Sequence, residues 1–159
     1  MSPCVGTRGE ESFRGAAPYH RAVKTLYTYV IEDSPVIRQS LVSALEDLVS
    51  VKVVGVADCE ADAVRALSEP ARRIDLVIVD VVLREGTGLG VLRRPEVKRP
   101  GRHFVVLSNY ATVEVRQRAT ALGAARVFDK SGEIEALIEY CEGLLDSDAS
   151  AGQSSRTGT

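Results

Sequence analysis

The 159-residue sequence contains no tryptophan, one methionine and only three cysteines. Cys4, Cys59 and Cys141 are scattered, with no C-x-x-C pair and no histidine at a zinc-binding spacing, which excludes the common structural zinc motifs. An odd and sparse set of cysteines is typical of a reducing compartment rather than of a disulfide framework. We therefore expect a cytoplasmic protein.

Two other features are missing, an excess of basic charge and any long apolar run. The sequence has 20 Lys and Arg against 22 Asp and Glu, a net charge of −2, which gives no indication of nucleic-acid binding. No stretch approaches the roughly 20 apolar residues that cross a bilayer. Residues 1–24 also lack the apolar centre of a secretory signal. We therefore expect neither a nucleic-acid nor a membrane partner.

The composition that is present suits one globular domain. Hydrophobic residues make up 45% of the sequence and charged residues 26%, and the length allows one sizeable core. Residues 1–24 are rich in Gly, Ser, Pro and Arg and show no periodicity, which predicts a disordered extension. We expect the domain over residues 25–146 and a disordered polar tail over residues 147–159.

Apolar runs and amphipathic segments alternate along the domain. The runs predict strands over residues 25–31, 51–57, 74–79, 104–107 and 125–128. The amphipathic segments predict helices over residues 35–48, 60–69, 87–94, 112–122 and 133–145. This alternation is typical of an α/β fold with a five-stranded parallel sheet and helices on both faces. Right-handed crossovers leave a few doubly wound strand orders.

Polar residues end four of the five runs. Asp80 follows the most strongly apolar one, where a carboxylate is costly to bury unless a cation or donor compensates it. Three other runs also end in polar residues: Glu32 and Asp33 follow the first, Ser108 the fourth and Lys130 the fifth. Parallel strands bring their carboxyl ends to one edge of the sheet, where doubly wound folds bind ligands. We therefore expect these side chains to converge.

The converging groups would suit phosphoryl transfer. Singly, an acid pair before a helix, a loop hydroxyl and a surface lysine each have a purely structural explanation. Together, three carboxylates would repel one another without a cation, and oxygen-only ligands suit Mg²⁺. A lysine and a hydroxyl can bind phosphoryl oxygens, while one carboxylate serves as nucleophile. Such chemistry depends mainly on positioning and charge neutralisation.

Four segments resemble those of response-regulator receiver domains of bacterial two-component signalling. They are Ile31-Glu32-Asp33-Ser34-Pro35, Leu76-Val77-Ile78-Val79-Asp80, Leu107-Ser108-Asn109-Tyr110-Ala111 and Phe128-Asp129-Lys130-Ser131. The resemblance covers about residues 25–146, in order and spacing. It implies a flavodoxin-like sheet with strand order 2-1-3-4-5.

The resemblance also implies a role for each site residue. Asp80 matches the phosphoacceptor, Ser108 the switch hydroxyl and Lys130 the lysine that contacts the phosphoryl group. The implied ligands of Mg²⁺ are Glu32, Asp33, Asp80 and the backbone carbonyl of Val82. Such a domain catalyses only its own phosphorylation and dephosphorylation.

The implied partners are proteins. A histidine kinase or a histidine phosphotransferase would supply the phosphoryl group. The output surface would lie on the segments 112–122, 125–128 and 133–145, and would meet an unknown downstream protein or a second copy of the chain. Its first helix offers residues that we expect to be exposed: Glu114, Arg116, Gln117 and Arg118.

Several positions depart from the family pattern. Arg84 and Ser131 stand where receivers often carry prolines, after the acceptor and after the lysine. Val127 occupies the usual place of the switch aromatic, with Phe128 beside it, so switching by an aromatic rotamer is in doubt.

Three further positions are expected to modulate the chemistry. Asn109 is larger than the small residue that usually follows the switch hydroxyl, and would narrow the access of phosphodonors. Val82 and Tyr110 hold positions that influence the attack of water on the phosphoryl group in the family. Their apolar and bulky side chains predict a persistent phosphorylated state.

Other functions stay open at this stage. A Mg²⁺-dependent phosphohydrolase usually has a second acid two residues after the nucleophile, where this chain has Val82. A nucleotide-binding module would need a Gly-rich loop after the first strand. A non-phosphorylated interaction module is compatible with Val127 and Asn109. Only residues 146–159 follow Leu145, so we expect a stand-alone receiver, a fragment or a phosphorelay intermediate.

Overall fold

The computed structural model of the protein describes residues 24–151. The predicted extension, apart from Lys24, and residues 152–159 of the predicted tail lie outside the described residues. One parallel sheet has the order β2-β1-β3-β4-β5, which confirms the doubly wound fold. Its strands are β1 (Leu26–Ile31), β2 (Val51–Ala57), β3 (Leu76–Val79), β4 (His103–Ser108) and β5 (Arg126–Asp129).

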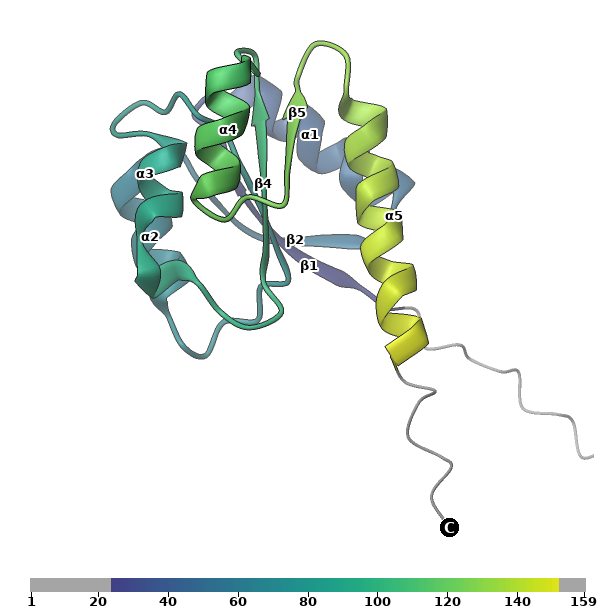
Figure 1. Ribbon diagram of the computed structural model, residues 1–159. Helices are drawn as coiled ribbons and strands as arrows, with labels where there is room; N and C mark the ends of the chain where they lie inside the picture. Colours follow the sequence, from purple (N-terminus) through teal and green to yellow (C-terminus); the bar gives the residue numbers. More distant parts are fainter. Residues whose placement is uncertain (1–23, 152–159) are drawn as a thin grey trace, which may run out of the picture.

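Helices cover both faces of the sheet (Figure 1). One face carries α1 (Pro35–Leu48) and α5 (Ile134–Ala151). The other carries α2 (Glu60–Ser68), α3 (Gly88–Arg93) and α4 (Val113–Ala121). None of the helices described between residues 24 and 151 has the length and apolar character needed to cross a membrane.

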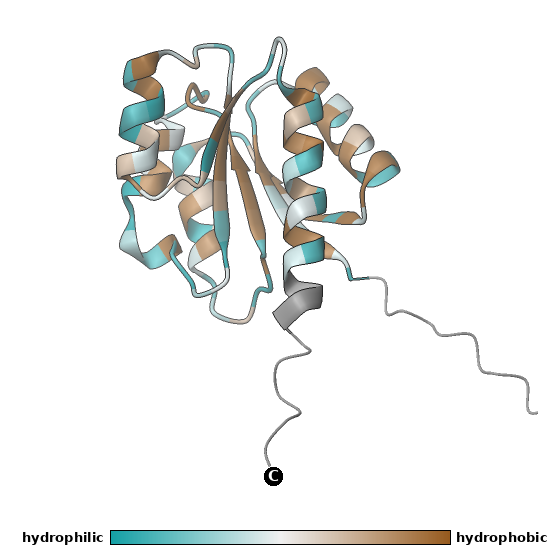
Figure 2. Ribbon diagram, turned by 45° about the vertical axis from the view of Figure 1, so that its right-hand side comes forward, coloured by the Kyte–Doolittle hydropathy of each residue, from teal (hydrophilic) through white to brown (hydrophobic). Residues whose placement is uncertain are grey.

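The central strand β3 joins two apolar layers, and all four of its residues are buried. Figure 2 shows that the strands in the middle of the molecule are mostly hydrophobic. Leu76 and Ile78 pack towards α1 and α5, while Val77 and Val79 pack towards α2, α3 and α4. This alternation follows from the two-residue period of a strand. Burying each such side chain contributes about 1.5–3 kcal/mol before entropy is counted, so β3 is a rigid base for the residue that follows it.

Local signals set the ends of the helices. Ser34 accepts a hydrogen bond from the Ile37 N–H at 3.4 Å and Pro35 follows it, so α1 begins where the sequence predicts. Gly123 follows α4 with a φ of +101°, a left-handed conformation that favours glycine.

The structure corrects one expectation about chain segments and adds one element that the sequence did not predict. The last helix does not end at Leu145 but continues to Ala151, so residues 147–151 are helical rather than part of a disordered tail. No proline or glycine interrupts this stretch, and alanine favours helix strongly. A 3₁₀ turn, η1 (Pro95–Val97), follows α3 and had no counterpart among the predicted elements.

Candidate functional site

Three carboxylates meet at the carboxyl edge of the sheet. Glu32 and Asp33 follow β1, and Asp80 follows the neighbouring strand β3. One oxygen from each lies within 4.8 Å of the others. Glu32 and Asp80 are only 2% and 7% exposed, while Asp33 is half-buried. The convergence expected from the sequence is therefore present, with Asp33 on the solvent side.

Lys130 supplies the cation that this acidic cluster needs. Its Nζ donates a hydrogen bond to Asp80 Oδ2 at 2.7 Å and a second one to Glu32 Oε2. Burial alone would lower the pKa of Lys130, but the hydrogen bonds to Asp80 and Glu32 outweigh it and the pKa is raised. Burial raises the pKa of Glu32, against the opposing effect of its hydrogen bonds from Lys130 and Ser34.

Ser108 completes the constellation from the end of β4. Its side chain is fully buried, and its Oγ accepts a hydrogen bond from the Tyr110 N–H at 3.1 Å. Its carbonyl accepts the Lys130 N–H at 3.1 Å, which ties the ends of β4 and β5 together. The hydroxyl can still donate its own hydrogen to an incoming oxygen.

Gly88 lets the start of α3 pack directly on the backbone of Asp80. A Cβ at this position would lie 1.9 Å from the Asp80 carbonyl oxygen and 2.8 Å from Val79 Cγ2. The Gly88 N–H also donates to the Val81 carbonyl at 2.9 Å. The backbone of the predicted phosphoacceptor is thus held by a contact that only glycine allows.

Polar contacts hold the loop after β3 where a proline is common in receivers. Arg84, which stands where receivers often carry a proline, donates a hydrogen bond to Asp58 Oδ1 at 3.0 Å. This contact connects the loop after β3 to the loop after β2. Glu60 accepts the Thr87 N–H at 2.9 Å through its carboxylate and donates its own N–H to the Glu85 carbonyl.

The three predicted modulating residues lie on the solvent side of the site. Val82 and Tyr110 are 54% and 66% exposed, and Asn109 is also exposed.

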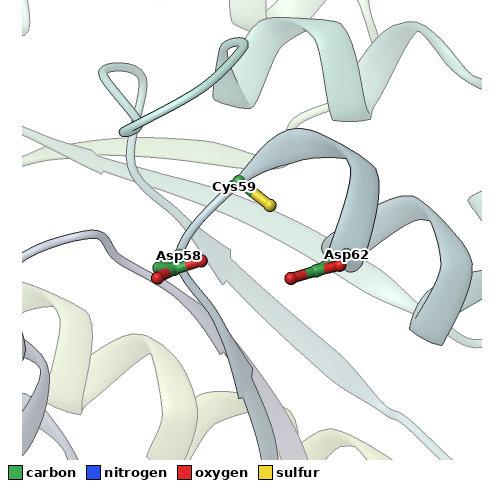
Figure 3. Close-up of side chains that lie close together, drawn as sticks. All are labelled: Asp58, Cys59 and Asp62. Atoms are coloured by element: carbon green, nitrogen blue, oxygen red, sulfur yellow. The ribbon is translucent and has the colours of Figure 1, made fainter.

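A second acidic cluster lies at the same edge, after β2 (Figure 3). Asp58 and Asp62 approach each other beside Cys59, the residue that precedes α2. Each carboxylate already has a guanidinium partner, because Asp58 pairs with Arg84 and Asp62 pairs with Arg65. We interpret this cluster as part of the loop and helix structure.

Arg116 and Glu133 have more contacts than the sequence predicts. Arg116 was expected to be exposed on α4, but it is half-buried and pairs with Glu133 at 3.1 Å. Glu133 Oε2 also accepts the Asp129 N–H at 2.5 Å, which brings this pair to the lysine loop. Nothing in the periodicity of α4 distinguishes Arg116 from its neighbours, so only the folded structure identifies it.

The donor set fits a hard divalent cation. The cluster offers three carboxylates close together, and one of them, Asp33, is accessible to solvent. Oxygen ligands of this kind are those that Mg²⁺ prefers in proteins. A carboxylate, a lysine and a hydroxyl at the same edge form a set of groups that can bind a phosphoryl group.

A family profile matches the same part of the chain. The profile described as the response regulator receiver domain covers residues 28–142. The chain belongs to the response-regulator receiver family. The fold, the strand order and the acidic cluster of this receiver domain agree with that assignment.

Two curated relatives match this chain over part of their own length. This chain is 35% identical over 104 residues to a protein-glutamate methylesterase/protein-glutamine glutaminase of Syntrophus aciditrophicus. The match covers 64% of this chain and 29% of that protein. The chain is 30% identical over 97 residues to the DNA-binding transcriptional activator DevR/DosR of Mycobacterium tuberculosis, covering 61% and 44%. The chain thus spans less than half the length of these relatives.

Solved structures share the fold of the receiver domain at low sequence identity. A two-component response regulator of the LuxR family from Aurantimonas superposes with a TM-score of 0.69 at 20% identity, covering 78% of this chain and 87% of that chain. A response regulator from Burkholderia pseudomallei with a phosphorylated aspartic acid has a TM-score of 0.62 at 20% identity, covering 83% and 75%.

Proposed function

We propose that this receiver domain accepts a phosphoryl group on Asp80 from a phosphohistidine and thereby switches a protein-interaction surface. The observation that carries the proposal is the buried contact between Lys130 and Asp80, which directly follow β5 and β3 at one edge of the sheet. A buried lysine held against two carboxylates is poised to meet further negative charge at that point. Membership of the receiver family supports the same function.

The transfer would use the carboxylate of Asp80 as nucleophile. One of its oxygens forms the new P–O bond, the P–N bond of the phosphohistidine breaks, and the imidazole nitrogen keeps the electron pair and takes a proton from water. Lys130 stays beside the acceptor and binds a phosphoryl oxygen, while the Ser108 hydroxyl donates to another. The pull of the phosphoryl oxygens on Ser108 and Lys130 would draw the ends of β4 and β5 inwards.

Glu32, Asp33, Asp80 and the backbone carbonyl of Val82 would hold Mg²⁺ at this site. When bound, the ion would neutralise part of the negative charge of the phosphoryl oxygens. Asp33 is the residue best suited to reach it first, because it is the most exposed of the three acids and has no role in the contacts of Lys130.

The proposal includes the partners and the setting. The donor would be a histidine kinase or a histidine phosphotransferase in the cytoplasm. The output face would be formed by α4, β5 and α5, which would bind a downstream protein or a second copy of the chain. The domain would act as a signalling phosphoacceptor and not on a separate substrate. A Mg²⁺-dependent phosphohydrolase is disfavoured by Val82, and a non-phosphorylated interaction module is the alternative that the experiment must separate.

Intact-mass measurement after incubation with Mg²⁺ and acetyl phosphate tests the proposal. The wild-type protein should gain one phosphoryl group, and Asp80→Asn should gain none. Asp58→Asn is a matched control, because Asp58 also follows a strand at the same edge but is paired with Arg84. Absence of the adduct in the wild type would favour the non-phosphorylated module, and an adduct on Asp80→Asn would place the chemistry elsewhere.

A further inference from the structure

The route by which an aromatic side chain could report phosphorylation is missing on β5. Val127 lies on the side of the sheet that faces α4, and a valine has no ring to swing between positions. Phe128 is buried on the opposite side, where its ring meets Tyr140 of α5 edge-on at 6.0 Å between centroids. The two residues cannot substitute for each other, because successive side chains of a strand point to opposite faces.

Arg116 of α4 occupies the junction where such a report would pass. Its Nε donates to the Ala111 carbonyl at 3.0 Å, and its two terminal nitrogens donate to the Val127 carbonyl at 2.8 Å and to Glu133 Oε2 at 3.1 Å. A planar guanidinium holds several acceptors in one fixed arrangement, which a lysine cannot do. One side chain therefore joins the loop after β4, the strand β5 and the start of α5.

Glu133 extends this junction to the residues on either side of Lys130. Its carboxylate accepts the Asp129 N–H, and Asp129 Oδ1 in turn accepts the Ser131 N–H at 2.8 Å. A proline at Ser131 could not donate this bond. The hydrogen bond from the Asp129 N–H is the main cause that lowers the pKa of Glu133, and the hydrogen bond from the Ser131 side chain is the main cause that lowers the pKa of Asp129. Such shifts are expected for carboxylates that accept several hydrogen bonds.

The Arg116 guanidinium thus contacts both segments that carry the groups expected to move. On one side, Ala111 follows Tyr110, whose N–H is bonded to Ser108. On the other side, Glu133 fixes the turn that presents Lys130 to Asp80. We infer that Arg116 and Glu133 form a positioning pair that transmits the state of Asp80 to α4, in place of an aromatic switch. This inference rests on the proposed phosphorylation of Asp80.

Hydrogen–deuterium exchange with and without acetyl phosphate and Mg²⁺ tests the pair. The proteins are compared at equal extents of phosphorylation, which intact-mass measurement gives. In the wild type, exchange over residues 113–121 should change on phosphorylation. Arg116→Gln should still form the adduct, because Asp80 and Lys130 are untouched. It should lose the change in exchange, because the contacts of Arg116 with Val127 and Glu133 are removed. Arg118→Gln should behave as the wild type, since Arg118 is exposed on the same helix.

A second variant keeps the test decisive if Arg116→Gln is poorly folded. Glu133→Gln retains an oxygen for the Asp129 N–H but loses its charge towards Arg116, and it should lose the same response. The double variant should be no worse than either single one, as for residues that act as a unit. A full response in Arg116→Gln or Glu133→Gln, or no response in the phosphorylated wild type, would overturn the inference. Failure of the wild type to form the adduct would instead overturn the proposed function.

Discussion

Replacing Lys130 with methionine should destabilise the protein strongly at neutral pH. The lysine side chain is 8% exposed and contacts two carboxylates, those of Glu32 and Asp80, whose side chains are 3% and 9% exposed. At the 2.7 Å between Lys130 Nζ and Asp80 Oδ2, Coulomb's law gives about 6 kcal/mol at an effective dielectric constant of about 20, before desolvation is subtracted. Removing one partner of a buried ion pair typically costs about 3–5 kcal/mol. Relaxation and proton uptake by a carboxylate bring our expectation to about 3 kcal/mol.

The assay is urea unfolding in EDTA, followed by circular dichroism. Lys52→Met is the matched control, because Lys52 is exposed, and it should change the unfolding free energy by less than about 0.5 kcal/mol. A loss of similarly small size in Lys130→Met would refute the electrostatic account of the site.

The pH dependence of the same variant gives a further check with a definite sign. Burial already raises the pKa of Glu32, and without the ammonium nothing but the Ser34 N–H opposes that effect. The folded variant would then bind a proton more tightly than the unfolded chain. The free energy of unfolding of the variant should therefore rise as the pH falls from about 8 towards about 5. The gain ends there because the unfolded chain also takes up the proton near the ordinary glutamate pKa of about 4.3. A loss of stability over this interval would contradict the reasoning.

Three other perturbations have expected outcomes. Gly88→Ala should cost about 1–3 kcal/mol of unfolding free energy, because its Cβ would overlap the Asp80 carbonyl, whereas Gly143→Ala on the open surface of α5 should stabilise by about 0.5–1 kcal/mol. Val82→Asn and Tyr110→Ala should each hasten the loss of phosphate, measured by intact mass over time, if the two side chains exclude water. Glu133 has a lowered pKa, so its stabilising contribution is present above the ordinary glutamate pKa of about 4.3 and is lost as the pH falls below it; thermal melts of Glu133→Gln should show a smaller loss in that range.

Each of these outcomes can fail in a distinct way. Equal melting temperatures for Gly88→Ala and the wild type would mean that the Asp80 backbone yields freely. Fast phosphate loss that neither Val82→Asn nor Tyr110→Ala alters would remove the predicted persistence. An acid-induced loss in Glu133→Gln as large as in the wild type would mean that this carboxylate is not a source of stability.

Sequence patterns predicted the fold because buried strands leave a strong signal. The run that ends at Asp80 is apolar enough to lie only in the centre of a sheet, and the segment over residues 35–48 begins with a cap and a proline. The position of Asp80, Glu32 and Lys130 at one edge then follows from parallel strands alone. The four receiver-like segments contain the three carboxylates that the structure brings together and the lysine that contacts two of them, while the roles of these residues stay predictions.

Contacts between distant polar side chains could not be predicted in the same way. Arg116 has the sequence environment of a solvated helix residue, and only the folded chain brings Glu133 to it. The sequence places Gly88 in the predicted helix over residues 87–94, but it does not show the close approach to the Asp80 carbonyl on which the role of this glycine depends. The extension of α5 to Ala151 was missed because short polar residues favour both tails and helix ends.

The most direct test of the central claim is to locate the phosphoryl group. After phosphorylation with acetyl phosphate and Mg²⁺, the acyl phosphate can be trapped by borohydride reduction and mapped by peptide mass spectrometry. The account predicts a single reduced residue at position 80, absent when Asp80→Asn is treated in the same way. Reduction at Glu32, Asp33 or Asp58, or no reduced residue in a fully folded wild type, would contradict it.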